Sequence, residues 1–295
     1  MGPDRRSVIG ALLAGLVVGR AANAFEVPAT PRLIDKDYSQ ARTQFRTHLT
    51  RMGPAPDEGD PLSPPPEGAE RFAYQSGPLK LSAWISTPSP GAARRPAVLF
   101  LHGGNALGSG HWDLTRPYRE AGYIAMVPAL RAENGQPGAF SAFYDETSDV
   151  LAAAQTLQNH SGVDRERIFL AGHSIGATQA LLAAMSTRMF RAAASFSGNP
   201  NAYAFFKRFP EEICFDTTDP AEFEMRSALC FAGSFKCPTR IFHGSEEKGL
   251  VAASDLTVRR ARDAGLDVVS QAMAGDHFSA LPAEIAASLA FFAAL

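Results

Sequence analysis

Residues 172–176 read Gly-His-Ser-Ile-Gly, and this stretch decides the expected fold. An apolar run at residues 167–171 precedes it, and a helix-like apolar run at residues 177–185 follows it. A serine between two such runs occupies a sharp strand-to-helix turn, where flanking glycines let the strand and the helix approach closely. The pattern predicts that Ser174 projects above a sheet edge, within reach of a base and a substrate. By itself the pentapeptide also fits an ordinary glycine- and serine-containing turn. The motifs around it therefore decide whether Ser174 is a catalytic nucleophile.

Two later segments supply the partners that a nucleophilic serine needs. A serine hydroxyl becomes reactive when a base removes its proton and a third group orients that base. Residues 239–244 form a strand-like run that ends just before Glu246 and Glu247. Residues 266–273 form another, and His277 follows it before the final apolar helix. The order serine, acid, histidine is the one found with this kind of turn, so we expect His277 to be the base.

An upstream glycine turn predicts an oxyanion hole. Residues 97–101 are a further apolar run, and they end in His-Gly-Gly-Asn at residues 102–105. Backbone N–H groups at such a turn, together with the N–H group after the nucleophile, stabilise a tetrahedral oxyanion. We expect these donors to be Ile175 and either Gly104 or Asn105.

These motifs, taken in order, resemble the α/β-hydrolase superfamily over residues 71–295. Within that superfamily, residues 131–135, 143–151 and 195–198 are similar to the branch that contains prolyl oligopeptidases and dienelactone hydrolases. The resemblance implies a mostly parallel central sheet with helices on both faces, and a serine hydrolase activity. Because this branch includes both peptidases and esterases, the resemblance does not choose between them.

The alternation of apolar runs predicts the same α/β fold. Residues 71–75 and 79–86 flank a Ser-Gly-Pro turn and predict an N-terminal antiparallel hairpin. Continuous apolar strands separated by helices are typical of a parallel sheet that is covered on both faces. The expected strands are residues 97–101, 123–127, 167–171, 192–196, 239–242 and 266–273, and the clearest helices are residues 114–121 and 143–160.

The acid of the triad has more than one candidate. Related chains of the resembled branch place an aspartate three residues after the glycine of a His-Gly turn, and Glu247 has that position here. Glu246 beside it is the alternative. Asp276 is adjacent to His277, and an adjacent side chain would point away from the imidazole that it has to orient.

The N-terminus predicts export. Arg5 and Arg6 precede a moderately apolar run that ends at Gly19, and Ala-Asn-Ala at residues 22–24 has the form of a cleavage site. Residues 1–24 therefore read as a signal peptide, and the paired arginines resemble a twin-arginine signal. An ordinary Sec signal or an uncleaved anchor is the alternative. We expect a periplasmic or secreted protein.

The remaining chain divides into three parts. Residues 25–68 are expected to hold one amphipathic helix, at residues 34–52, and a proline-rich linker. Residues 69–295 are the expected catalytic domain. Within it, residues 199–236 are rich in aromatic side chains and predict a small cap over the active site, although ordinary packing on the sheet edge is the alternative. There is no room in this sequence for the propeller that screens substrates in large prolyl oligopeptidases.

Composition excludes several classes of partner. The formal charge is −2, and it becomes −4 without residues 1–24, with no basic stripe of the kind that binds nucleic acid. No second long apolar run predicts a membrane span after signal cleavage. Cys214 and Cys230 could form a disulfide in an oxidising compartment, whereas Cys237 is expected to pack as an apolar residue. No spacing indicates a metal, and we expect no cofactor.

The sequence therefore predicts two-step acyl transfer on a small ester or a short peptide. His277 would deprotonate Ser174, which would attack the carbonyl and form an acyl-enzyme that water then hydrolyses. We expect ester hydrolysis to exceed amide hydrolysis. A serine peptidase of the prolyl oligopeptidase type is the first alternative, and a catalytically silent hydrolase fold that binds a ligand is the second.

Overall fold

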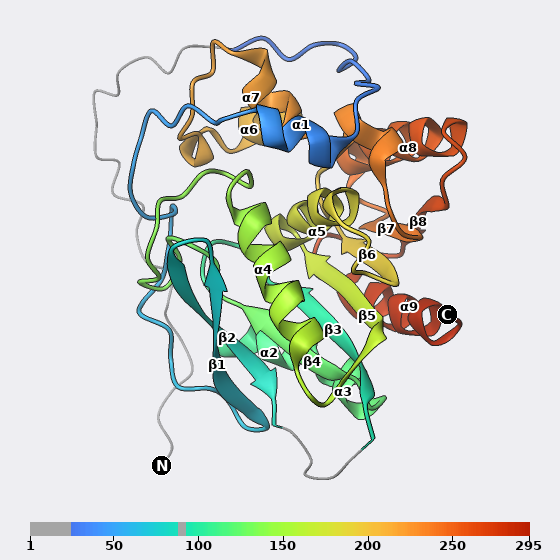
Figure 1. Ribbon diagram of the computed structural model, residues 1–295. Coiled ribbons are helices and arrows are strands. Elements are labelled where there is room, and N and C mark those ends of the chain that lie inside the picture. The colour runs from blue at the N-terminus through green and yellow to red at the C-terminus, as the bar shows by residue number, and fades with distance from the viewer. Residues whose placement is uncertain (1–24, 88–92) are drawn as a thin grey trace, which may run out of the picture.

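An eight-stranded sheet organises the molecule in a computed structural model that describes residues 25–87 and 93–295 (Figure 1). The strand order is β1-β2-β4-β3-β5-β6-β7-β8. β1 pairs with β2 and β2 with β4 in antiparallel fashion, and all later neighbours are parallel. The predicted α/β fold with its N-terminal hairpin is thus confirmed. The strands are Ala69–Ser76, Leu79–Ser86, Arg95–Leu101, Ile124–Pro128, Val163–His173, Ala192–Phe196, Thr239–Gly244 and Val268–Met273.

Helices cover both faces of the sheet, as Figure 1 shows. One face packs on α4 (Glu146–Asn159), α5 (Ile175–Ser186) and α8 (Lys248–Asp263). The opposite face packs on three other helices, α2 (Ser109–Leu114), α3 (Arg116–Glu120) and α9 (Leu281–Ala293). Continuous apolar strands are the expected result, because both of their faces are buried.

The segment between β6 and β7 forms a compact aromatic unit beside α5. It contains α6 (Ala202–Arg208), η1 (Pro210–Glu212), α7 (Pro220–Glu224) and η2 (Ala228–Ser234). Edge-to-face ring pairs hold it together, including Phe206 with Phe215 at 4.9 Å and Phe215 with Phe223 at 5.2 Å between ring centroids. These aromatic residues thus pack on one another and belong to the same buried cluster as α4, α5 and the sheet face that those helices cover.

The cysteines are free thiols in the structure. Cys214 and Cys230 are both buried, and the Cys214 thiol donates a hydrogen bond to the backbone oxygen of Phe140. Burial raises the pKa of each of these two thiols to about 12. The disulfide considered from the sequence is absent between them in the part of the chain that the structure describes.

The N-terminal helix is shorter than residues 34–52. α1 spans Tyr38–Gln44, begins at an N-cap aspartate, Asp37, and ends where Phe45 turns to extended backbone. Leu49 then forms a β-bridge with Phe215, and the N–H group of Thr50 donates to the backbone oxygen of Cys214. Backbone pairing with the aromatic segment therefore replaces the last turns of the expected helix.

The proline-rich stretch at residues 53–68 is bound to the domain and is not a free linker. The Ala55 N–H group donates to the backbone oxygen of Ala132, and the Asn134 N–H group donates to that of Glu58. Leu62 is buried against the sheet face that carries α2 and α3. The predicted signal peptide, residues 1–24, lies outside the described residues. In the described ranges, no helix combines the length and apolar character needed to span a membrane.

Candidate active site

The turn between β5 and α5 holds Ser174 in a strained conformation. Its backbone angles are φ 56° and ψ −118°, a region that costs a non-glycine residue about 1–3 kcal/mol. A Cβ on Gly172 would lie 2.4 Å from the oxygen of Gly176, and one on Gly176 would lie 2.4 Å from two backbone oxygens of the β3 end. Only glycine fits at both positions, so the two glycines of the pentapeptide are required by the close strand–helix contact.

His277 lies in the loop between β8 and α9, and its partner is Glu247. Its Nδ1 atom is 2.7 Å from Glu247 Oε1. The other oxygen of Glu247 accepts hydrogen bonds from Ser197 Oγ at 2.5 Å and from the Gly244 N–H group at 2.9 Å. Burial by itself would raise the pKa of Glu247, but these hydrogen bonds outweigh it and hold the pKa below its usual value. The carboxylate is therefore charged at neutral pH.

The two other acidic candidates do not contact the imidazole. Glu246 is exposed, and no hydrogen bond joins its side chain to His277 in the described structure. Asp276 accepts hydrogen bonds from the N–H groups of Phe278 and Ser279 and from the Ser279 hydroxyl. These bonds lower the pKa of Asp276 to about 2 and tie the side chain to the turn before α9.

Ser174, Glu247 and His277 line one cavity of about 690 Å³. The aromatic segment contributes Phe205 and Phe209 to its wall, as the predicted cap would. Within the described residues, no hydrogen bond joins Ser174 to His277. Such contacts are often long when no substrate is bound, so this geometry is compatible with proton transfer between them.

The turn after β3 packs directly against the Ser174 turn. A Cβ on Gly103 would lie 3.1 Å from His173 Nδ1 and 3.3 Å from Ser174 Cβ, so glycine permits the approach. Gly104 adopts a positive φ of 67°. Among the described residues, the backbone N–H groups of Gly104, Asn105 and Ile175 donate no hydrogen bond. Three donors near the nucleophile are thus available to a ligand.

Asn105 also connects this turn to the aromatic segment. Its buried side-chain amide donates to both oxygens of Glu212, at 2.9 and 3.1 Å. Burial raises the pKa of Glu212 to about 7, and the hydrogen bond from Asn105 opposes that rise. Sequence reasoning gave Glu212 no role, because its partner lies 107 positions away in the chain.

The histidines outside the cavity make local contacts. His102 Nε2 lies 3.0 Å from Glu133 Oε2, and both side chains are buried. Burial alone would lower the pKa of His102, but the charge of Glu133 raises it. His173 Nε2 lies 3.1 Å from the backbone oxygen of His277 and so supports the loop that carries it. No group of three His, Cys, Asp or Glu side chains in residues 25–87 and 93–295 could hold a metal ion.

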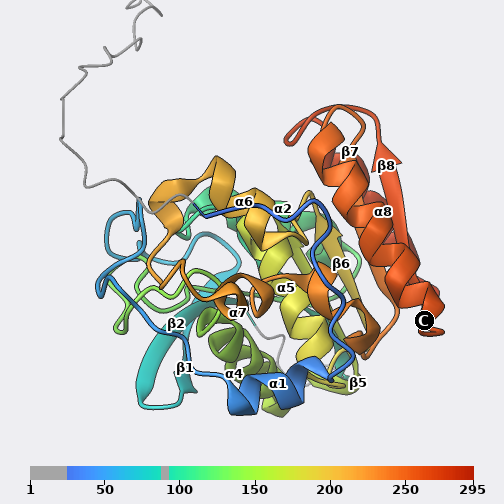
Figure 2. The ribbon, with the colours of Figure 1, turned by 90° about the horizontal axis from the view of Figure 1, so that it is seen from above.

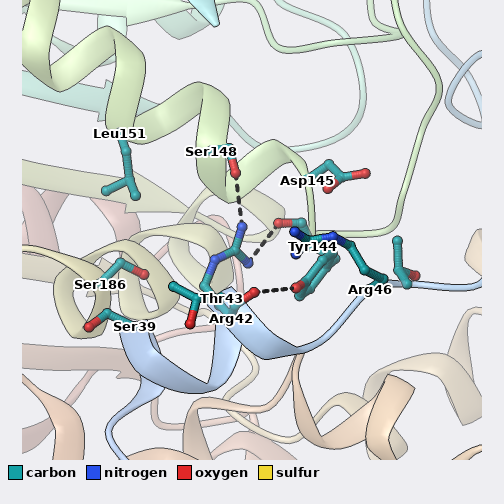
Figure 3. Close-up of a pocket in the computed structure, with 10 residues that line it drawn as sticks. Ser39, Arg42, Thr43, Arg46, Tyr144, Asp145, Ser148, Leu151 and Ser186 are labelled. Carbon is teal, nitrogen blue, oxygen red and sulfur yellow. Dashed lines mark hydrogen bonds between the residues drawn. The ribbon is translucent and has the colours of Figure 1, made fainter. Parts of the chain in front are cut away.

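A second cavity, of about 450 Å³, lies between α1 and α4 (Figure 3). Arg42 points from α1 toward α4 and donates to Ser148 Oγ and to the backbone oxygen of Tyr144, both at 2.9 Å. The Tyr144 hydroxyl donates back to the oxygens of Arg42 and Phe45. This cavity contains none of the predicted catalytic residues, and its contacts fix the N-terminal helix to the domain.

Comparison with known sequences identifies the family of this chain. The sequence model of the prolyl oligopeptidase family matches residues 117–278, which include the Ser174 turn, Glu247 and His277. No curated protein sequence matches the chain.

Solved structures with a similar fold include peptidases and esterases. The acylaminoacyl peptidase of Pyrococcus horikoshii is 21% identical with a TM-score of 0.64, and the match covers 77% of this chain and 41% of that one. Thermogutta terrifontis esterase 2 is 21% identical with a TM-score of 0.60, and the match covers 79% of this chain and 97% of the esterase. A Klebsiella pneumoniae protein assigned as a dienelactone hydrolase is 16% identical with a TM-score of 0.60, and the match covers 76% of this chain and 98% of that protein. These matches show the α/β-hydrolase fold, and this chain spans about 40% of the length of the acylaminoacyl peptidases.

Proposed function

This chain is a serine hydrolase that belongs to the prolyl oligopeptidase family, and we propose that it cleaves an ester bond through a Ser174–His277–Glu247 triad. One observation carries the proposal. The 2.7 Å contact between His277 Nδ1 and Glu247 Oε1 lies at the cavity that Ser174 also lines. A carboxylate at Nδ1 fixes the imidazole tautomer that leaves Nε2 free to accept a proton.

The first half of the reaction forms an acyl-enzyme. His277 Nε2 takes the proton of the Ser174 hydroxyl while Ser174 Oγ attacks the ester carbonyl carbon. Glu247 stabilises the imidazolium that results. His277 then donates the proton to the leaving alkoxide as the carbon–oxygen bond breaks. In the second half, water replaces the serine as nucleophile, the same proton transfers occur, and the acid is released.

The tetrahedral oxyanion is held by backbone N–H groups. Ile175 directly follows the nucleophile, and Gly104 or Asn105 belongs to the turn that packs on it. Their N–H groups make no other hydrogen bond in the described structure, so they are free to donate to developing charge. Removal of one such donor in other hydrolases costs about 10²–10³ in turnover.

The cavity wall favours an uncharged acyl group. Apart from Glu247, the charged side chains that line it are exposed to solvent, namely Arg208, Glu246, Lys248 and Asp276. Phe205 and Phe209 provide apolar area within it. A wall of this kind offers no buried charge to hold a peptide terminus, and an amide needs more transition-state stabilisation than an ester because its leaving group is poorer. A short-chain ester is therefore the proposed substrate class.

Active-site labelling tests the triad. A fluorophosphonate probe should label wild-type protein, and Ser174→Ala should abolish labelling. Ser174→Ala and His277→Ala should each abolish ester hydrolysis with little change in thermal stability, and the double variant should lose no more than either single variant. Near-wild-type turnover by Ser174→Ala would refute the triad. A folded wild-type protein that takes up no probe would favour a catalytically silent binding protein.

A substrate comparison tests the ester assignment against the peptidase alternative, which the family membership keeps open. kcat/KM should be measured for p-nitrophenyl acetate and for alanine and proline p-nitroanilides. We expect clear hydrolysis of the ester and far slower hydrolysis of the anilides. Faster cleavage of an anilide would make the protein a serine peptidase and leave the triad proposal intact.

A further inference from the structure

The turn that follows β3, residues 102–105, is bound at both ends by buried carboxyl groups. At its start, His102 Nε2 lies 3.0 Å from Glu133 Oε2. At its end, the Asn105 side-chain amide donates to both oxygens of Glu212, at 2.9 and 3.1 Å. Glu133 belongs to the loop after β4, whereas Glu212 belongs to η1 in the aromatic segment. Two distant parts of the chain therefore hold this turn in place.

The residue with the least steric support in the turn is Gly104. It has a positive φ of 67°, and no atom outside its chain neighbours lies within 4 Å of the position that a Cβ would occupy. Glycine has the widest range of backbone conformations, so Gly104 does not fix the N–H directions around it by itself. Gly103 packs on the Ser174 turn. The attachment of Asn105 on the other side therefore decides how these N–H groups point.

That attachment depends on Glu212 alone. Both side chains are buried, and the side-chain amide nitrogen of Asn105 has Glu212 as its only hydrogen-bond partner among the described residues. In the same part of the chain, the Glu212 carboxyl group has no ion pair and accepts no other hydrogen bond. The neighbouring cation, Arg51, donates instead to the backbone oxygen of Glu211. A buried carboxyl group with so few partners is costly, which indicates that the contact with Asn105 has a role.

The same short helix also contributes to the catalytic cavity. Phe209, which lines the cavity, is the N-cap residue of η1, and its backbone oxygen accepts a hydrogen bond from the N–H group of Glu212. A cavity wall residue and the carboxyl group that binds Asn105 thus belong to one helical turn. Through η1, the position of the cavity wall and the position of the turn after β3 are linked.

We propose that Glu212 is a positioning residue for the oxyanion hole, which binds the Asn105 side chain and so directs the backbone N–H groups of Gly104 and Asn105 toward the oxyanion formed at Ser174. The inference rests on the proposed function, because it assumes acyl transfer to Ser174. It holds for an ester or an amide, since both pass through a tetrahedral oxyanion. Donors that are already in place stabilise this charge without reorganising during the reaction.

Kinetics on p-nitrophenyl acetate test the proposal. Glu212→Leu removes the acceptor of Asn105, so kcat should fall about tenfold while KM stays within about twofold, as expected for an interaction made in the transition state. Glu212→Gln keeps one acceptor oxygen and should recover most of kcat. Phenylboronic acid forms a tetrahedral adduct with a nucleophilic serine, so its affinity should fall in Glu212→Leu by the same factor as kcat.

Two controls separate positioning from stability. Glu211→Leu changes the exposed neighbour on the same η1 helix and should keep wild-type kcat. The double variant Asn105→Leu with Glu212→Leu replaces both buried partners by apolar groups, which can leave stability nearly unchanged. Its urea midpoint should therefore be close to that of wild type, while its kcat should be as low as that of Glu212→Leu. Wild-type kcat in this stable double variant would overturn the proposal, because the pair would then serve stability alone.

Ser174→Ala distinguishes failure of this inference from failure of the proposed function. If Ser174→Ala is inactive but a folded Glu212→Leu protein keeps wild-type kcat, the Glu212 inference is overturned and the proposed function stands. If hydrolysis persists in Ser174→Ala, the proposed function is overturned, and the inference that rests on it is overturned as well.

Discussion

Glu246 and Glu247 are adjacent and chemically identical, yet only Glu247 touches His277. The reason lies in the backbone before them. A Cβ on Gly244 would lie 2.6 Å from the oxygen of Gly275, so glycine lets the loop after β7 press against the loop after β8. Glu247 then sits at the N-cap of α8 with its carboxylate turned back over Gly244, while Glu246 faces solvent. Position in the turn, not residue type, separates the two.

This difference predicts unequal effects of the same substitution. Glu247→Gln should leave the fold intact and reduce kcat sharply, by up to about 10⁴-fold, because an amide at this position does not hold the required imidazole tautomer. Glu246→Gln is the matched control and should change kcat less than about threefold. Steady-state kinetics on an aryl ester, with circular dichroism to check folding, make the comparison. The opposite ranking would transfer the role of the acid to Glu246.

Some of the residues at or near the candidate site can be predicted from the sequence, and others cannot. Ser174 and His277 can be selected because each follows an apolar strand, and parallel strands bring their carboxyl ends to one edge. Glu246 and Glu247 follow the same strand, so the pattern of strands does not choose between them, and only the resemblance to related chains favours Glu247. Glu212 and Glu284 read as surface charges, because glutamate is rarely buried. Their surroundings come from distant parts of the chain: Glu212 is bound by Asn105, 107 positions away, and Glu284 lies buried in α9 without a hydrogen-bond partner among the described residues.

At the scale of elements, hydrogen bonds from the N-terminal segment to a buried ion pair of the aromatic segment join the two segments. Arg226 and Glu222 are 0% and 1% exposed, with Nη1 and Oε2 2.5 Å apart. Arg226 Nη2 also donates to Thr47 Oγ1, and Glu222 accepts from the His48 N–H group. Figures 1 and 2 show the blue N-terminal segment running over α5 and alongside the orange segment that these contacts join.

Arg226→Ala should therefore destabilise the whole protein. It would leave Glu222 buried without its cation, and breaking a buried ion pair costs about 3–5 kcal/mol. Arg116→Ala is the matched control, because its pair with Asp113 is 59% and 61% exposed and such pairs contribute about 0–1 kcal/mol. The free energy of unfolding from urea titration measures both. Equal, small effects would show that the pair does not hold the segments together.

Elements were predictable where local pattern and tertiary environment agree. The apolar runs of the parallel strands and the long helix α4 fit their buried surroundings, so their existence follows from sequence. The expected helix at residues 34–52 was wrong in extent, because Leu49 gains a backbone partner in Phe215 that local sequence does not reveal. The linker at residues 53–68 was misread for the same reason, since Asn134 and Ala132 bind its backbone.

At the scale of the whole molecule, buried titratable groups set the pH dependence of stability. Burial raises the pKa of Glu146 and Glu212 to about 7 and that of Glu284 to about 8. The folded state thus binds more protons than the unfolded state from about pH 4.5 up to these values, and stability falls as pH rises. His111 and His173 act oppositely, because burial lowers their pKa values to about 4 and their contribution is lost as pH falls below about 6.5.

The two sets oppose each other below about pH 6.5. Above it the carboxyl groups act together with His102, whose pKa is raised by the charge of Glu133 and whose contribution is therefore also lost as pH rises. The free energy of unfolding should therefore decrease between pH 6.5 and pH 8.5, as measured by urea titration at fixed ionic strength. Glu284→Gln should flatten that decrease and be more stable than wild type at pH 8. Stability that rises over this interval would contradict the assigned burial of these carboxyl groups.

The hydrogen bonds and ion pairs between residues 32–48 and residues 222–236 can form only late in the synthesis of the chain. Thr47 leaves the ribosome 179 positions before Arg226, its hydrogen-bond partner. At about 5–20 residues per second, the early segment waits about 10–40 s before its binding surface has been made. During that interval Tyr38 and Phe45, which are packed in the finished protein, stay available to chaperones. The first described segment of the chain is thus among the last to reach its final place.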